Sequence, residues 1–308
     1  MLAIRLIRYF KNHNIYDFFI FISRGILLSV TKRWKNQIYK RIVNTTSFPK
    51  LTSSSAKSAV IVSMTTFPKR YNEVVVSIKS LLLQKQLPDK IILYLGTDCD
   101  VNSLPEQLLE LQQYGVEIKT GYPDIRPHKK YFFAMQEYPD NIIITVDDDL
   151  IYDKFLISDL LKSYKRYPNA ISATRVHRML VKNEIICPYN KWDYEYTSLI
   201  KPSLQLLSTN GAGTLFPPHI LPDETFDIEK IQKYALNADD IWLKFMMLRK
   251  QLPVVLCNRR RPVLEAIQSA QQEALSQINV IQNKNDEVID LLQKKLGINL
   301  AEYGYKLK

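Results

Sequence analysis

Apolar and polar residues follow a regular order from residue 59 onward. Short apolar, β-branched runs typical of strands lie at 59–64, 90–95, 116–119 and 141–146. Segments with helical spacing of apolar positions separate them, at 74–82, 104–114 and 131–138. Strands that alternate with helices favour a parallel sheet with right-handed crossovers. The run at 141–146 is apolar at nearly every position, which is typical of a central strand covered on both faces.

The second half of the chain has a more mixed pattern. Helices are expected at 154–167, 227–234 and 239–250, and strands at 171–175 and 254–257. Composition favours helices in the tail as well, at 265–279 and 286–296. The whole pattern predicts an α/β fold with a mostly parallel sheet, flanking helices and C-terminal helices.

Charge is distributed unevenly along the chain. The 308 residues carry a formal charge of +11, but residues 1–50 alone hold ten Lys and Arg against one acid, Asp17. The remaining residues are therefore nearly neutral. With no basic stripe on the folded part, we expect no nucleic-acid partner. Three widely spaced cysteines without a C-x-x-C pair indicate neither disulfides nor a zinc site, and favour a reducing cytosol.

The basic N-terminal segment contains an apolar run at 15–28 that Asp17 and Arg24 interrupt. A spanning helix needs about 20 mostly apolar residues, and no small-x-small cleavage site follows the run. The segment fits an interfacial helix on an anionic membrane, where each basic side chain adds about 1 kcal/mol. The alternative is a helix that packs on the body and keeps a solvated basic face. The first interpretation predicts a cytoplasmic protein, peripheral on the inner face of the plasma membrane.

These features divide the chain into four parts. Small polar residues end the basic segment and indicate a linker. The predicted parts are a basic amphipathic segment at 1–50, a linker at 51–57, an α/β domain at 58–262 and a helical extension at 263–308.

Three consecutive carboxylates, Asp147, Asp148 and Asp149, follow the apolar run at 141–146. In open α/β sheets ligands bind at the carboxyl ends of the strands. Carboxylates one residue apart can both reach a hard cation, Mn²⁺ or Mg²⁺, which in turn holds phosphate oxygens. A solvated acidic turn is the simpler alternative.

Three further motifs bear on that choice. Lys129 and Lys130 begin the helix before the acidic run, where ammonium groups and the helix N-terminus both favour an anion. Asp239 and Asp240 begin a later helix, and capping needs only one of them. The segment 211–213 holds two of only eight glycines, which indicates close backbone approach. His177 and His219 receive no role, because lone histidines are usually structural.

The order of these motifs resembles that of GT-A-fold glycosyltransferases, more narrowly bacterial enzymes that build capsule or lipopolysaccharide. The resemblance covers about residues 58–260 and rests on Ser63-Met64-Thr65-Thr66, Asp147–Asp149, Gly211–Gly213 and Asp239-Asp240. It implies transfer of a sugar from a nucleotide-diphosphate donor, UDP-sugar favoured, to a hydroxyl of a glycan or lipid-linked acceptor. The segment 95–100 departs from the Asp-Asp-Gly-Ser cluster of many relatives, so no base-binding aspartate is assigned there.

The resemblance also implies site roles. Asp147 and Asp149 would hold Mn²⁺ or Mg²⁺. Asp240, or else Asp239, would be the catalytic base of an inverting reaction. The donor would contact Thr65, Thr66, Arg70, Lys129, Lys130, Asp147, Asp148, Gly211, Ala212 and Gly213.

Other functions fit the sequence less well. A sugar nucleotidyltransferase would be expected to carry a glycine-rich loop after the first strand, and residues 65–70 contain no glycine. An aspartyl phosphatase would need its nucleophile at that same place. A non-catalytic membrane adaptor would use the basic segment alone and leave Asp147–Asp149 as a solvated turn.

Overall fold

The computed structural model describes residues 36–52, 58–258, 265–267 and 284–307. The chain divides into two compact units, residues 1–46 and 47–308. Of the first unit, the described part contains a helix over residues 36–44; the predicted interfacial run at 15–28 lies outside the described residues. None of the described helices has the length and apolar character that crossing a membrane requires.

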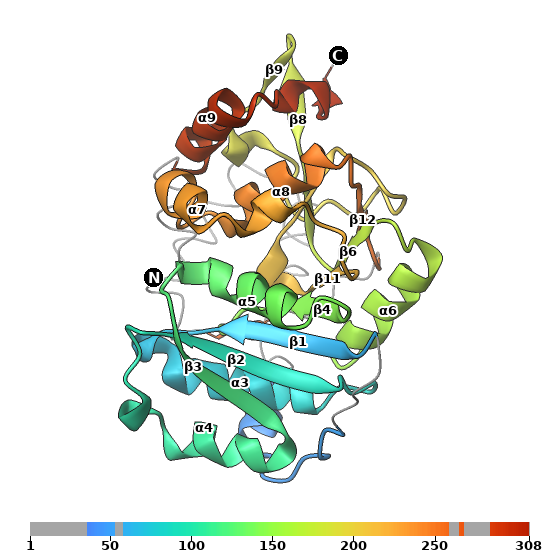
Figure 1. Ribbon diagram of the computed structural model, residues 1–308. Coiled ribbons are helices and arrows are strands. Elements are labelled where there is room, and N and C mark those ends of the chain that lie inside the picture. Colours follow the sequence, from blue (N-terminus) through green and yellow to red (C-terminus); the bar gives the residue numbers. More distant parts are fainter. Residues whose placement is uncertain (1–35, 53–57, 259–264, 268–283, 308) are drawn as a thin grey trace, which may run out of the picture. The chain divides into compact units, whose positions relative to one another are not determined.

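A seven-stranded sheet forms the centre of the second unit (Figure 1). Its strands are β1 (Val60–Thr65), β2 (Lys90–Gly96), β3 (Val116–Tyr122), β4 (Ile142–Thr145), β6 (Ile171–Ala173), β11 (Thr214–Phe216) and β12 (Val254–Leu256). They lie in the order β12-β6-β11-β4-β1-β2-β3. All neighbours are parallel except β11, which runs antiparallel to both β4 and β6. The predicted α/β fold with a mostly parallel sheet is confirmed.

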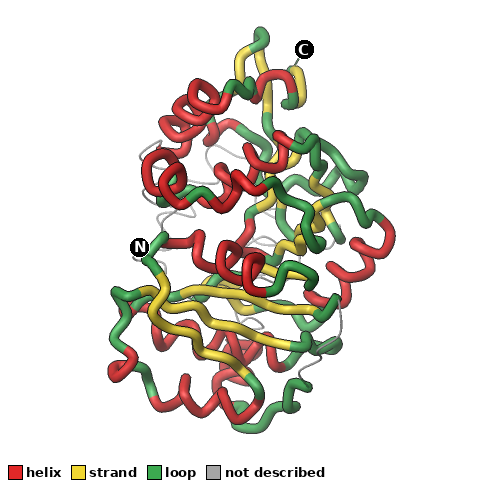
Figure 2. Tube along the Cα trace, viewed as in Figure 1, coloured by secondary structure: helices red, strands yellow, loops and turns green. Residues whose placement is uncertain are grey.

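Helices cover both faces of this sheet (Figure 2). The described helices of this unit are α3 (Tyr71–Leu82), α4 (Glu106–Glu110), α5 (Lys129–Glu137), α6 (Leu156–Arg166), α7 (Ile228–Tyr234), α8 (Asp239–Arg249) and α9 (Lys284–Leu296). Helix α5 lies on one side of β1 and β2, and α3 and α4 lie on the other (Figure 1). Alternate residues of a strand point to opposite faces, so Ile61 and Ile92 join one apolar core while Val62 and Ile91 join another.

Short strands outside the main sheet form three small sheets. Strands β7 (Val176–Arg178) and β10 (Leu206–Ser208) pair, as do β5 (Leu150–Ile151) and β13 (Glu265–Ala266); β14 (Tyr305–Lys306), β8 (Leu180–Lys182) and β9 (Ile185–Ile186) form the third. The helix predicted at 265–279 is therefore wrong at its start, because Glu265 and Ala266 pair with β5; residues 268–279 lie outside the described part. The helix predicted at 286–296 is confirmed as α9, which contacts α7 and α8.

Single turns of 3₁₀ helix complete the connections. They are η1 (Pro68–Arg70), η2 (Val101–Ser103), η3 (Leu111–Tyr114), η4 (Arg126–His128), η5 (Tyr189–Lys191), η6 (Asn210–Ala212), η7 (Asp223–Phe226) and η10 (Leu300–Glu302). Two of them matter for the site, since η1 follows β1 and η6 precedes β11.

Candidate active site

Strand topology brings the predicted motifs to one edge of the sheet. Strands β1 and β4 are parallel neighbours, so their carboxyl ends lie at the same edge of the sheet. Thr65, the last residue of β1, and Thr66 are at this edge, as are Asp147–Asp149 after β4. Strand β11 is antiparallel to β4, and its first residue, Thr214, pairs with Thr145. The segment before β11, residues 210–213, therefore lies at the same edge.

Asp147 packs directly against the glycine segment. Its backbone N–H lies 2.9 Å from the Gly211 carbonyl oxygen, and the Tyr152 hydroxyl donates to that same oxygen at 2.7 Å. A Cβ atom on Gly211 would lie 1.5 Å from Asp147 Oδ2, so no other residue fits there without moving Asp147. Gly213 has φ +109°, a backbone region that L side chains rarely adopt. These contacts explain both glycines by close approach and by backbone conformation.

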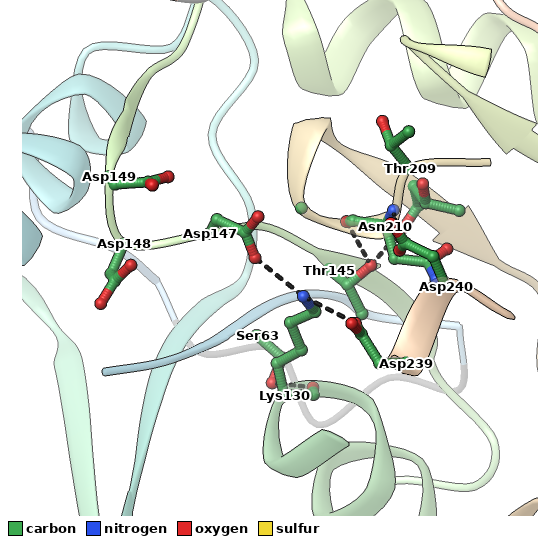
Figure 3. Close-up of polar contacts among 12 residues, drawn as sticks. Ser63, Lys130, Thr145, Asp147, Asp148, Asp149, Thr209, Asn210, Asp239 and Asp240 are labelled. Atoms are coloured by element: carbon green, nitrogen blue, oxygen red, sulfur yellow. Dashed lines mark hydrogen bonds and ion pairs between the residues drawn. The ribbon is translucent and has the colours of Figure 1, made fainter. Parts of the chain in front are cut away.

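The three aspartates do not point the same way. Asp147 and Asp149 project to one side of the segment and Asp148 to the other (Figure 3). Asp148 is buried, accepts a hydrogen bond from the Thr66 hydroxyl at 2.6 Å, and pairs with Arg70 at 2.8 Å. Arg70 also reaches Asp149 Oδ2 at 3.1 Å. Asp148 thus ties the acidic segment to the loop after β1, while Asp147 and Asp149 face the centre of the site.

Lys130 joins the two acidic motifs. Its side chain is only 3% exposed, and Nζ lies 2.8 Å from Asp147 Oδ1 and 2.9 Å from Asp239 Oδ2 (Figure 3). Its backbone carbonyl accepts a hydrogen bond from the Ser63 hydroxyl, which fixes the first turn of α5 against β1. Successive helix residues point about 100° apart, and Lys129 instead pairs with Asp124 near the end of β2. The structure brings Lys130 to the acidic residues but not Lys129.

Asp239 and Asp240 begin α8 without capping it. The N-cap residue is Ala238, and no side chain caps the helix. Asp240 Oδ1 accepts a hydrogen bond from the Asn210 backbone N–H at 2.8 Å, and the Asn210 carbonyl accepts one from the Thr145 hydroxyl at 2.9 Å. Asp239 is buried, whereas Asp240 is half-buried. The loop that contacts Asp147 is therefore also hydrogen-bonded to Asp240.

Three predicted donor contacts have structural partners. Thr65 donates to the backbone carbonyl of Tyr94 in β2 at 2.8 Å. The Ala212 carbonyl accepts a hydrogen bond from the Thr174 hydroxyl at 2.6 Å, as does the Gly213 carbonyl at 3.3 Å. These bonds hold the loops in place. The donor-binding roles assigned to these residues stay predictions.

Burial and charge shift the pKa values in the acidic segment in opposite directions. Burial, with the charges of Asp147 and Asp148, raises the pKa of Asp149 to about 7. Burial would also raise the pKa of Asp147, but the charges of Lys130 and other cations outweigh it and lower that pKa. Asp149 thus lies in negative potential that the protein does not fully compensate.

Asp240 shows a similar shift. Burial, followed by the charge of Asp239, raises its pKa to about 7, and Lys130 opposes the shift only in part. A carboxyl group with a pKa near the operating pH is suited to accept a proton during a reaction.

The acidic centre fits a divalent cation in charge and in donor type. Asp147 and Asp149 each retain one carboxylate oxygen, Oδ2 and Oδ1, that has no partner among the described residues. Oxygen ligands suit Mg²⁺ and Mn²⁺. Five carboxylates (Asp147, Asp148, Asp149, Asp239, Asp240) lie with three cations (Arg70, Lys130, Arg175), which leaves two negative charges when all five carboxylates are ionised. Within the described part of the chain no group of three or more His, Cys, Asp or Glu has metal-site geometry, so a bound cation would take its remaining ligands from substrate and water.

Sequence reasoning missed several residues of this site. Thr145 is a polar position within an apolar strand, and that signal could have identified it. Ser63 belongs to the motif at 63–66 but received no site role of its own. Tyr152 and Arg175 gave no such signal, because their contacts depend on how distant loops meet.

Comparisons with known proteins give a likeness of fold only. No family model matches the chain, and no curated protein does. One similar solved structure is a mannosyltransferase from Pyrobaculum calidifontis in complex with GDP-Man and Mn²⁺, 9% identical, with a TM-score of 0.49 over 88% of this chain and 72% of that one. Another is the inositol-1-phosphate CTP transferase from T. maritima, 10% identical, with a TM-score of 0.40 over 79% of this chain and 98% of that one. At these values we base no functional conclusion on either.

Proposed function

We propose that the protein is a metal-dependent glycosyltransferase that moves a sugar from a nucleotide-diphosphate donor, with UDP-sugar favoured, to a hydroxyl of a glycan or lipid-linked acceptor. The observation that carries this proposal is the pairing of two acidic motifs through Lys130. Asp147 and Asp149 offer a cation two carboxylate oxygens that no described residue engages, and Asp240 offers a base close by.

The donor half of the reaction uses the acidic segment. Asp147 and Asp149 would hold Mn²⁺ or Mg²⁺, which on binding neutralises charge that develops on a diphosphate leaving group. An ion pair with Lys130 holds the Asp147 carboxylate, and an ion pair with Arg70 holds that of Asp149. Gly211 lets the Asp147 carboxylate pack directly against the backbone, because a side chain at residue 211 would overlap it. A carboxylate pair held this firmly needs little reorganisation when the donor binds.

The acceptor half uses Asp240. Its Oδ1 is occupied by the Asn210 N–H, so Oδ2 is the oxygen that accepts the proton of the acceptor hydroxyl. The acceptor oxygen forms a bond to the anomeric carbon, the bond from that carbon to the diphosphate oxygen breaks, and the nucleoside diphosphate leaves with the electron pair. A single displacement of this kind inverts the anomeric configuration. Asp239, buried against Lys130, is the less suitable base.

Cell-surface polysaccharide synthesis is the setting that we favour. The basic residues within 1–50 would hold the enzyme on the anionic inner face of the plasma membrane. Lipid-linked acceptors occur at that surface. This part of the proposal rests on sequence alone.

The direct test is donor turnover. Purified protein is incubated with UDP-, GDP-, dTDP- and CDP-sugars with Mn²⁺ or with EDTA, and release of the nucleoside diphosphate is measured. We expect metal-dependent turnover of one donor, lost in Asp149→Ala and retained in Asp290→Ala, a matched change at an exposed aspartate of α9. No turnover and no metal-dependent nucleotide binding would refute the proposal and leave the membrane adaptor.

A second incubation distinguishes a nucleotidyltransferase from a glycosyltransferase. Incubation with a nucleoside triphosphate and a sugar phosphate releases pyrophosphate only if the protein is such an enzyme. The segment after β1 passes from Thr65 into η1 without a glycine, so we expect none.

A further inference from the structure

A group of aromatic and hydrogen-bonding side chains lies next to Asp240. Strand β7 pairs with β10, and His177 is opposite Leu207. Beyond that pair, Arg175 Nε donates to the Thr209 hydroxyl at 2.7 Å, and the Thr209 N–H donates to the Arg175 carbonyl at 3.1 Å. The next residue, Asn210, donates its N–H to Asp240. The end of β7 is therefore connected to the proposed base through two successive residues.

The ring of His177, in β7, packs against the rings of Tyr189 and Tyr194. The His177 ring lies 4.4 Å from that of Tyr194 and 6.1 Å from that of Tyr189, measured between centroids. Tyr189 and Tyr194 meet edge to face at 5.8 Å. Tyr189 and His177 are buried, but Tyr194 is 41% exposed. The cluster thus presents one tyrosine to the surface over a buried aromatic base.

The segment that carries Tyr194 is held in place. Asp193 and Arg178 exchange two backbone hydrogen bonds, of 2.9 and 3.1 Å, and the Arg178 Nε donates to Asp193 Oδ2 at 2.7 Å. The Arg178 guanidinium also lies 4.1 Å from the centroid of the Tyr196 ring. Fixed contacts on both sides of Tyr194 keep its ring oriented, which lowers the entropy cost of binding against it.

Two hydrogen-bond donors of the cluster have no acceptor among the described residues. His177 Nδ1 accepts the Glu195 backbone N–H at 3.0 Å, so the proton of the neutral ring is on Nε2. Burial lowers the pKa of His177 to about 4, with Arg175 acting in the same direction, so the ring is neutral at pH 7. No described residue accepts from Nε2 or from the Tyr189 hydroxyl. Both donors can therefore bond to the hydroxyl oxygens of a ligand.

We propose that His177, Tyr189 and Tyr194 form a subsite for a pyranose ring of the acceptor, beside Asp240. A sugar ring has an apolar C–H face that stacks on an aromatic ring, and hydroxyl oxygens that accept hydrogen bonds from groups such as Nε2–H and a tyrosine hydroxyl. The subsite specifies the acceptor class as a glycan end rather than a bare lipid. This inference rests on the proposed function for its role, but sugar binding can be measured without turnover.

The test is ligand-observed NMR with a panel of methyl hexopyranosides, on the full-length protein with diamagnetic Mg²⁺ and the nucleoside diphosphates. We expect one or more members to show saturation transfer. Tyr194→Ala should weaken binding about fivefold, Tyr194→Phe should retain it, and Phe155→Ala, which removes a ring that is 44% exposed elsewhere, should not change it. His177→Phe keeps a ring but removes Nε2–H, and should reduce discrimination between epimers about threefold to tenfold.

Near-UV circular dichroism of each variant identifies loss of folding. If Tyr194→Ala unfolds, His177→Phe keeps the test valid, because unchanged discrimination between epimers in that folded variant refutes the subsite. The subsite is refuted if no methyl hexopyranoside binds the wild-type protein, or if binding is the same in Tyr194→Ala. Donor hydrolysis by the wild-type protein is measured in parallel. Tyr194-dependent sugar binding without donor turnover would refute the transferase and leave the sugar site, whereas donor turnover with Tyr194-independent binding would refute the subsite alone.

Discussion

Replacement of Lys130 by methionine tests the arrangement on which the site depends. The change keeps the apolar stem and removes the ammonium group that lies between Asp147 and Asp239. Removing one partner from a buried ion pair costs about 3–5 kcal/mol, because the remaining charge stays buried. Asp147 is 37% exposed and so is partly solvated, which favours the lower end. We expect Lys130→Met to lose about 3 kcal/mol in free energy of unfolding at pH 8, a large share of the stability of a typical domain.

The sign of the pH dependence gives a second check. In the wild-type protein the pKa of Asp147 is lowered, so its contribution to stability is present above its unfolded pKa and is lost as the pH falls through the folded value. Without Lys130, burial should raise the pKa of Asp147 instead. As the pH falls, protonation of Asp147 then removes the uncompensated charge and stabilises the variant. The deficit of Lys130→Met should therefore be smaller at pH 5 than at pH 8.

Urea unfolding followed by circular dichroism at the two pH values measures both effects. Lys162→Met, which changes a side chain that is 77% exposed and 3.8 Å from Asp159, is the matched control and should lose no more than about 0.5 kcal/mol. The reasoning is wrong if Lys130→Met loses less than about 1 kcal/mol at pH 8, as expected of a surface pair, or if its deficit is the same at both pH values.

Three other changes follow from the same contacts. Gly211→Ala places a Cβ on Asp147 and should reduce donor turnover about a hundredfold in the hydrolysis assay, since a displacement of about 1 Å has that effect; normal turnover would contradict the close approach. With a pKa of about 7, Asp240 is protonated below that pH, so kcat/KM should rise about tenfold per pH unit up to pH 7 and then level off, and Asp240→Asn should be inactive; a flat profile would exclude Asp240 as the base. Asp148→Ala removes a buried partner of Arg70 and should cost about 2–4 kcal/mol in urea unfolding; a neutral result would show that Asp148 is not structural.

Periodicity identified the elements of the fold where each element is long or fully buried. The runs at 59–64, 90–95 and 141–146 correspond to β1, β2 and β4, since a strand covered on both faces is apolar at most of its positions. Prediction was wrong at Glu265–Ala266, which composition assigned to a helix. The two-residue strand is formed by pairing with β5, which lies more than a hundred residues away in the sequence. Local sequence patterns cannot predict such a pairing.

Several residues of the candidate site stand out in the sequence, but their contacts do not. The acidic motifs, Lys130 and Gly211 all stand out in the sequence by charge clustering or by the scarcity of glycine. Residues that are adjacent in the sequence can have different contacts, because their side chains point in different directions. Lys129 and Lys130 are adjacent in α5 and contact different carboxylates, because one helical step changes the direction of a side chain by about 100°. Periodicity alone does not specify which of two adjacent residues faces the sheet edge.

The five aspartates of the site divide into two kinds, and the division follows from partners and exposure. Asp148 and Asp239 are buried against cations, and each holds two segments together. Asp147, Asp149 and Asp240 also accept one contact each from the protein, but each keeps a second carboxylate oxygen that no described residue engages. The first kind positions the second, and the second kind retains the oxygens that a cation or a substrate proton can use. On this basis substitutions in the first kind should act mainly on stability, and those in the second mainly on turnover.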